Sequence, residues 1–101
     1  MNFKTSIATA ALALVISAPA FAQTHYTGQE LAKYAKVSLE QARATALRAV
    51  HGAIVAQELE KETGGLRYSF DIKVGKKTYE VGVDAKTGKV IENAVEGANP
   101  D

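Results

Sequence analysis

Apolar residues recur with a helical period in the first half of this chain and with a period of two in the second half. Over residues 38–51 they follow the i, i+3, i+4 spacing of a helix with one apolar face. Over residues 66–74 and 79–83 they alternate with polar residues, as in strands with one buried face. Because such a helix and such a sheet must cover each other, the sequence predicts a two-layer α+β fold.

The ends of the predicted helix carry signals of their own. Ser38 and Gln41 have the spacing of a capping box, in which each side chain binds the other's backbone N–H. After His51, Gly52 is expected to take the left-handed conformation that closes many helices. A shorter helix is expected over residues 28–35, capped by the preceding Thr, so the helical layer is one helix or a helix–loop–helix.

The strand predicted over residues 53–62 has an irregular phase, because two apolar residues, Ile54 and Val55, are adjacent. With Val55 and Leu59 facing the core, Gln57 would face it too, so a β-bulge is expected in this strand. Together with the hairpin around the Gly-Lys-Lys turn at 75–77, this strand makes an antiparallel meander of three to four strands.

The end of the chain predicts one more short strand. Residues 84–88 read as a turn with Gly88 in a left-handed conformation. Residues 89–91 then return as a strand, and residues 93–101 are expected to be a flexible tail.

Residues 1–22 are typical of a secretory signal peptide. Lys4 is their only charged residue, an apolar run of about ten residues follows, and Ala20-Phe21-Ala22 has the A-x-A form of a cleavage site. The run is too short for a membrane anchor, which needs about 20 apolar residues. We expect cleavage between Ala22 and Gln23, a periplasmic or secreted product, and no membrane attachment afterwards.

The composition excludes several classes of protein. The 101 residues contain no Cys, so thiol chemistry, disulfides and Cys-based metal sites are excluded. Without the leader, 79 residues remain with 11 basic and 11 acidic side chains. A neutral domain with no basic stripe has no electrostatic footprint for nucleic acid. The expected organisation is the leader, an N-terminal segment over 23–36, a domain over 37–92 and the tail.

No catalytic, cofactor-binding or metal-binding set of residues can be picked out. His25 and His51 are the two histidines, and a cation at a helix C-terminus is the simpler explanation for the second. Glu58, Glu60 and Glu62 share one face of a strand, and we call them the acidic strip. The strip could bind a cation or dock a partner. We favour a simpler interpretation, in which it is a solvated face that discourages pairing at a sheet edge. The common nucleotide, hydrolase and zinc motifs do not occur. We therefore expect a protein that is not an enzyme.

Over roughly residues 37–92, several sequence features occur in the order and spacing of a known domain family. After the helix and its Gly52 break come Glu58-Leu59-Glu60 at the end of a strand and then the alternating residues of Tyr68–Ile72. The most specific part is the stretch Val-Asp-Ala-Lys-Thr-Gly-Lys-Val at 83–90. In this order and spacing the chain resembles the PepSY domain, found in propeptides of secreted thermolysin-like metallopeptidases and as small free-standing exported proteins.

The resemblance implies a protein partner and no catalytic residue. Propeptide members inhibit the attached peptidase and assist its folding, so an exported inhibitor or modulator of a peptidase is the expected function. This chain has His51 where many members have Pro before the helix-ending Gly. The alternative function is an envelope protein that binds a small ligand or a metal ion, through the acidic strip or a pocket between helix and sheet.

The candidate partner-binding surface is the sheet face turned away from the helix, which is expected to be open to water. A free sheet edge that accepts a further strand is the other surface considered. The alternation of the predicted hairpin places these residues on the polar face: Arg67, Ser69, Asp71, Lys73, Thr78 and Glu80.

Overall fold

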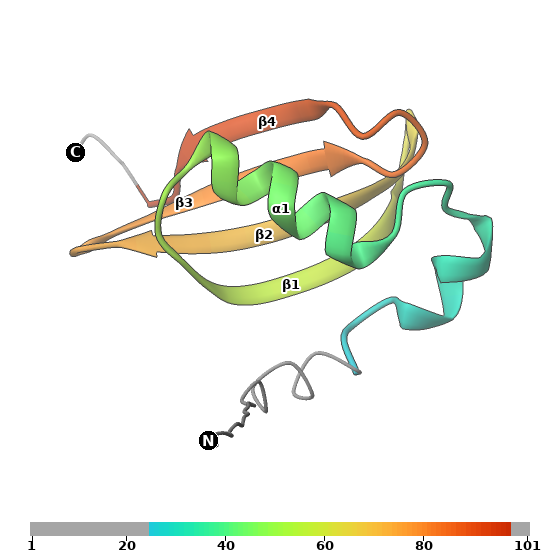
Figure 1. Ribbon diagram of the computed structural model, residues 1–101, viewed down its shortest axis with the longest axis horizontal. Helices are drawn as coiled ribbons and strands as arrows, with labels where there is room; N and C mark the ends of the chain where they lie inside the picture. The colour runs from blue at the N-terminus through green and yellow to red at the C-terminus, as the bar shows by residue number, and fades with distance from the viewer. Residues whose placement is uncertain (1–24, 98–101) are drawn as a thin grey trace, which may run out of the picture.

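The computed structural model describes residues 25–97, so the predicted leader with its cleavage site and residues 98–101 lie outside the described residues. The elements are the 3₁₀ helix η3 (Gln29–Tyr34), the helix α1 (Leu39–Ala49) and the strands β1 (Ala53–Glu62), β2 (Gly65–Val74), β3 (Lys77–Asp84) and β4 (Val90–Val95). The four strands form one antiparallel sheet in the order β1-β2-β3-β4, and α1 lies across one of its faces (Figure 1). The predicted α+β fold is confirmed.

The core lies between α1 and the sheet. Ala42 and Ala46 are the buried residues of α1, and their small side chains leave room for the larger side chains of the sheet. The phenol of Tyr68 on β2 donates a hydrogen bond to the carbonyl of Val37, 2.7 Å away, just before the helix. The sheet contributes these fully buried side chains: Leu59, Tyr68, Phe70, Ile72, Val81 and Val83. None of the described helices has the length and hydropathy to cross a membrane.

The capping box is confirmed, and the predicted helix end is wrong. Ser38 Oγ accepts from the Gln41 N–H at 3.1 Å, and the Ser38 N–H donates to Gln41 Oε1 at 2.9 Å. The helix ends at Ala49, and Gly52 does not have a positive φ. Glycine is required there for another reason, because a Cβ on Gly52 would lie 2.4 Å from the carbonyl oxygen of Lys73. The chain passes too close to the end of β2 for any side chain.

A bulge in β1 is confirmed, with a different phase from the one expected. The pairing of β1 with β2 shifts between Ile54 and Ala56, so Val55 has no partner and is 59% exposed. Val55 was expected to face the core, and that prediction is wrong. The bulge instead puts Ile54 on the same side as Gln57, whose side chain accepts a hydrogen bond from Arg43 of α1.

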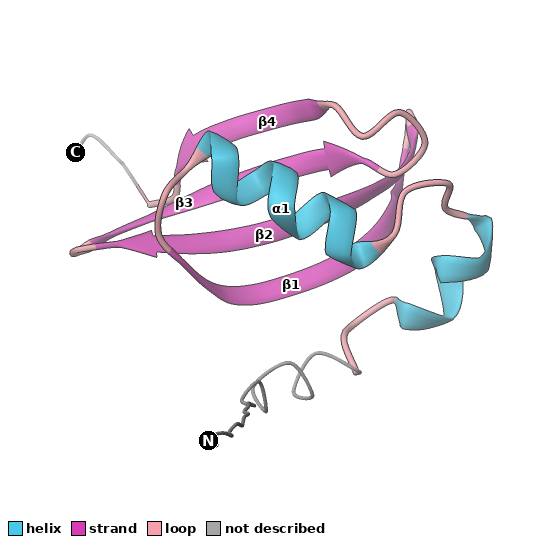
Figure 2. Ribbon diagram, viewed as in Figure 1, coloured by secondary structure: helices cyan, strands magenta, loops and turns pink. Residues whose placement is uncertain are grey.

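The segment before α1 contacts the outer edge of β1 through Thr27 and Gly28, and η3 then extends beyond the sheet (Figure 2). Thr27 forms a parallel bridge with Glu58, and its carbonyl accepts a 2.9 Å hydrogen bond from the N–H of Leu59. The predicted side-chain cap by Thr27 is wrong, because η3 begins after Gly28, at a φ of 85°, without a side-chain cap. A Cβ on Gly28 would lie 1.7 Å from the Leu59 carbonyl oxygen, so only glycine permits this contact.

The last strand is longer than the sequence indicates. The turn at 84–88 is confirmed, with Asp84 Oδ1 accepting from two backbone N–H groups and Gly88 at a φ of 81°. The predicted strand at 89–91 is wrong in its bounds, since β4 covers Val90–Val95 and includes residues 93–95 of the expected tail. As an edge strand, β4 has little burial and little alternation of polar and apolar residues to reveal it.

Candidate functional site

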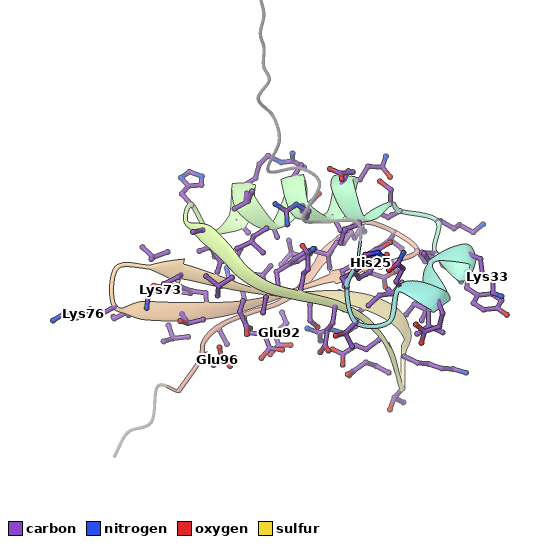
Figure 3. All side chains as sticks on the ribbon, turned by 90° about the horizontal axis from the view of Figure 1, so that it is seen from below. His25, Lys33, Lys73, Lys76, Glu92 and Glu96 are labelled. Carbon is purple, nitrogen blue, oxygen red and sulfur yellow. The ribbon has the colours of Figure 1, made fainter. Side chains whose placement is uncertain are left out.

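The polar face of the sheet, on the side away from α1, is the candidate site, and we call it the open face. The register of β2 with β3 places Ser69 opposite Gly82, Asp71 opposite Glu80, and Lys73 opposite Thr78. All six predicted residues therefore belong to one face. Viewed along the sheet, Glu92 of β4 and Glu96, which follows it, project from this same side (Figure 3).

Two of the predicted residues are not open to water. The Arg67 side chain is 12% exposed and Ser69 is 6% exposed. They are covered because neighbouring strands contribute longer side chains to the same face, among them Glu60 and Glu92. Arg67 and Ser69 thus form the floor of the site, while Lys73 is exposed.

Arg67 is the centre of an ionic cluster that joins all four strands. Its Nη2 lies 2.8 Å from Glu92 Oε1 and 3.9 Å from Glu80 Oε2, and its Nε lies 3.8 Å from Glu60 Oε2. Its Nε also donates a hydrogen bond to Ser69 Oγ at 3.0 Å. The Ser69 hydroxyl in turn donates to Glu60 Oε2 at 2.6 Å. Nη2 itself makes no hydrogen bond of good angle, so its contact with Glu92 is an ion pair.

Gly82 makes this cluster possible. It pairs with Ser69 on one side and with Glu92 on the other, so it lies in the path of the Arg67 side chain. A Cβ at Gly82 would lie 2.1 Å from Arg67 Nη2 and 2.5 Å from Cζ. The guanidinium therefore occupies the space of the missing side chain. A glycine inside a strand is a known sign of such close approach, and this sign was overlooked in the sequence.

Beside the cluster the open face is hollowed. The hollow has a volume of about 320 Å³ and its lining is mostly polar. Asp71, Glu80 and Glu96 line one part of it, and one carboxylate oxygen of each lies within 4.8 Å of the others. Glu96 was missed because it lay in the expected tail. The full lining is Thr27, Ala56, Gln57, Glu58, Ser69, Asp71, Glu80 and Glu96.

Crowded carboxylates change the acidity of the face. Burial raises the pKa of Glu58, and the negative charge of Glu60 raises it further. Burial likewise raises the pKa of Glu80, with the charge of Glu92 acting in the same direction and Arg67 opposing it. Both carboxylates would gain from a nearby cation, so the face favours positively charged groups of a partner.

The acidic strip lies only partly on the open face, and the two histidines lie outside the open face. Glu58 and Glu60 of the strip belong to the open face, whereas Glu62 is exposed at the end of β1. His25 precedes η3 and His51 follows α1, and both are exposed. The chemistry that the open face offers is charge and hydrogen bonding.

Comparison with known proteins identifies the family of the chain. No curated protein matches the chain, and no solved structure matches it. A family model, described as "Peptidase propeptide and YPEB domain", matches residues 36–93, more than half of the chain and nearly the range of the resemblance noted in the sequence. The match covers α1, β1, β2 and β3 entirely and most of β4. With this match and this fold, the chain belongs to the PepSY family.

Proposed function

We propose that this protein is a non-enzymatic binding module of the cell envelope that inhibits or modulates a peptidase, with the open face as its contact surface. Membership of a family described by its peptidase propeptides supports a peptidase as the partner. The signal peptide expected over residues 1–22 supports a location in the periplasm or outside the cell.

The arrangement around Arg67 is the observation that supports this choice of surface. Ion pairs and hydrogen bonds hold Glu60, Ser69 and Glu92, from three different strands, in one geometry before any partner arrives. Side chains that are already fixed lose little conformational entropy on binding, so more of the contact energy becomes affinity. A rigid polar face of this kind suits a protein partner with a defined surface.

The charge of the face indicates which partner surface fits. Arg67 and Lys73 are outnumbered on the described part of the face by its acidic side chains. A basic patch on the partner would be complementary, and association would be faster at low salt. The acidic residues are Glu58, Glu60, Asp71, Glu80, Glu92 and Glu96.

Binding of a metal ion or small ligand is the alternative function. The group of Asp71, Glu80 and Glu96 is the feature that bears on it. Calcium takes six to eight oxygen ligands, usually with loop carbonyls among them, whereas these carboxylates stand on a regular sheet. We therefore interpret the three carboxylates as part of the open face that contacts the partner protein.

The test is capture of the partner with a readout of activity. The purified protein, immobilised, is exposed to the extracellular and periplasmic fractions of its own source, and the bound material is assayed for peptidase activity on casein. We expect a peptidase to be retained and its activity to fall when free protein is added. Retention of no peptidase, or activity that the protein leaves unchanged, would rule out the proposal.

A further inference from the structure

The two outer edges of the sheet differ in whether another segment of the described chain covers them. The outer edge of β1 is covered in its middle, where Thr27 pairs with Glu58 and Gly28 packs on the Leu59 carbonyl. Within residues 25–97 no segment pairs with the outer edge of β4, which ends the sheet on the other side (Figure 1). An unpaired strand edge is a template for another strand.

The hydrogen bonds of β4 show which of its backbone groups are free. The N–H of Glu96 donates to the Thr78 carbonyl at 2.7 Å, in continuation of the register that pairs Tyr79 with Val95. Because alternate residues of a strand direct their backbone groups to opposite edges, the even-numbered residues from 92 to 96 face β3. Asn93 and Val95 then present their N–H and C=O groups outward.

β4 carries several exposed apolar side chains together with Glu92, and Glu96 follows directly after it. Val90, Ile91 and Val95 are 40%, 51% and 37% exposed, which makes β4 the strand with the most exposed apolar side chains among the described residues. Glu92 and Glu96 project to the open face. Lys, Arg and Pro, which protect many natural edge strands, are absent from β4 itself.

The charges along this edge are only partly balanced. Arg67 pairs with Glu92. Glu96 stands with Asp71 and Glu80 instead, and among the described residues the one ion pair of this group is the 3.9 Å contact of Arg67 with Glu80. A residue paired beside Glu96 therefore lies next to a carboxylate that forms no ion pair with another described residue. Cross-strand neighbours lie about 5 Å apart, so opposite charges attract and like charges destabilise there.

We propose that the outer edge of β4 binds an extended segment of another protein as an antiparallel fifth strand. The segment carries Lys or Arg beside Glu96, an apolar residue beside Val95, and a second basic residue four positions on, beside Glu92. This inference goes beyond the proposed function, since it concerns the edge of the sheet rather than its open face. It also does not require that the partner be a peptidase.

The probe is the peptide acetyl-Thr-Lys-Val-Thr-Thr-Lys-Val-Thr-amide with a fluorescent label, and binding is followed by fluorescence anisotropy. In the proposed register its third and fifth residues direct their N–H groups to β4. N-methylation of both should abolish binding, whereas N-methylation of the fourth and sixth should leave affinity within about twofold, since those groups face away from β4. A peptide with Glu in place of both Lys residues should bind at least about tenfold more weakly.

On the protein side, Val95→Pro removes one outward N–H without removing a bond to β3, and should weaken binding at least about tenfold. Equal binding of the two methylated peptides, or unchanged binding by a folded Val95→Pro variant, would overturn the proposal. Sedimentation would overturn it too if the protein were a dimer that Val95→Pro dissociates, because a second copy would then occupy the edge. The methylated peptides keep the test valid if the variant does not fold.

Discussion

At the scale of single residues, the open face depends on Arg67 and on Gly82, whose missing side chain leaves room for the arginine. Arg67 crosses from β2 to β4 because Gly82 has no side chain in its way. Its neighbours then close over it, so that a guanidinium on a polar sheet face is almost as buried as a core residue. A buried charge is stable when its partners surround it and costly when they are displaced.

We predict that Gly82→Ala destabilises the protein by about 1–3 kcal/mol, because the new methyl group displaces the guanidinium from its carboxylates. Urea unfolding followed by circular dichroism measures the change. The matched control is Gly64→Ala, at a position where an added Cβ meets nothing within 4 Å, with an expected change within about 0.5 kcal/mol. Equal effects of the two substitutions would contradict the role of Gly82.

The raised pKa values of Glu58 and Glu80 predict the direction of a pH effect. A carboxyl whose pKa is higher in the folded state than in the unfolded state binds its proton more tightly when folded. Its contribution to stability is therefore present below the unfolded pKa, near 4.5, and is lost as pH rises through the folded value. Glu80→Gln should raise the free energy of unfolding at pH 7 and flatten its dependence on pH above about 4.5.

The measurement is urea unfolding at a series of pH values, with Glu62→Gln, at the exposed end of β1, as the control. Asp84 acts with the opposite sign, because backbone hydrogen bonds from Thr87 and Lys86 lower its pKa. Its stabilisation is lost only as pH falls below about 3.8, so it does not obscure the Glu80 effect. A Glu80→Gln variant less stable than the parent at pH 7 would show that its contact with Arg67 outweighs the crowding.

At the scale of elements, the sequence predicted those parts of the fold that have a clear pattern. The period change and the capping box gave α1, and strict alternation gave β2 and β3. The alternation of apolar and polar residues was a poor guide for the two edge strands. β4 is exposed on most of its length, and the bulge in β1 reverses the phase at Val55. The six candidate residues share the face away from α1, as the alternation predicted, but the burial of Arg67 depends on Gly82 and Glu92, which come from other strands and could not be read from β2 alone.

We predict that Gly28→Ala detaches the segment before α1 from β1, because the new Cβ would overlap the Leu59 carbonyl and the φ of 85° is unfavourable for alanine. The Leu59 amide, which donates to Thr27, should then exchange with deuterium at least about tenfold faster, reflecting about 1.4 kcal/mol or more of lost protection. Hydrogen exchange followed by NMR measures it.

Gly97→Ala is the matched control, because Gly97 also has a positive φ but has open space around it. It introduces the same kind of backbone strain with no contact to β1. Unchanged protection of Leu59 in Gly28→Ala would mean that the segment does not cover the β1 edge as described. The contrast between a covered β1 edge and a free β4 edge would then disappear.

At the scale of the whole molecule, the fold separates two tasks. One face of the sheet packs against α1 and supplies the core, which leaves the other face available for charged groups. That division agrees with a PepSY domain that acts through contact with a partner. In such a module, substitutions on the open face should alter partner binding without altering the fold, since the two faces share only the backbone.

The most direct measurement is the concentration of protein that halves the activity of the captured peptidase, compared between two charge reversals. Glu58→Lys changes the open face on β1, two strands away from the β4 edge. Glu40→Lys makes the same change of charge on the exposed side of α1. We expect Glu58→Lys to raise the concentration at least about tenfold, or about 1.4 kcal/mol, and Glu40→Lys to change it less than twofold. Equal effects, or a larger effect of Glu40→Lys, would contradict the assignment of the open face as the contact surface.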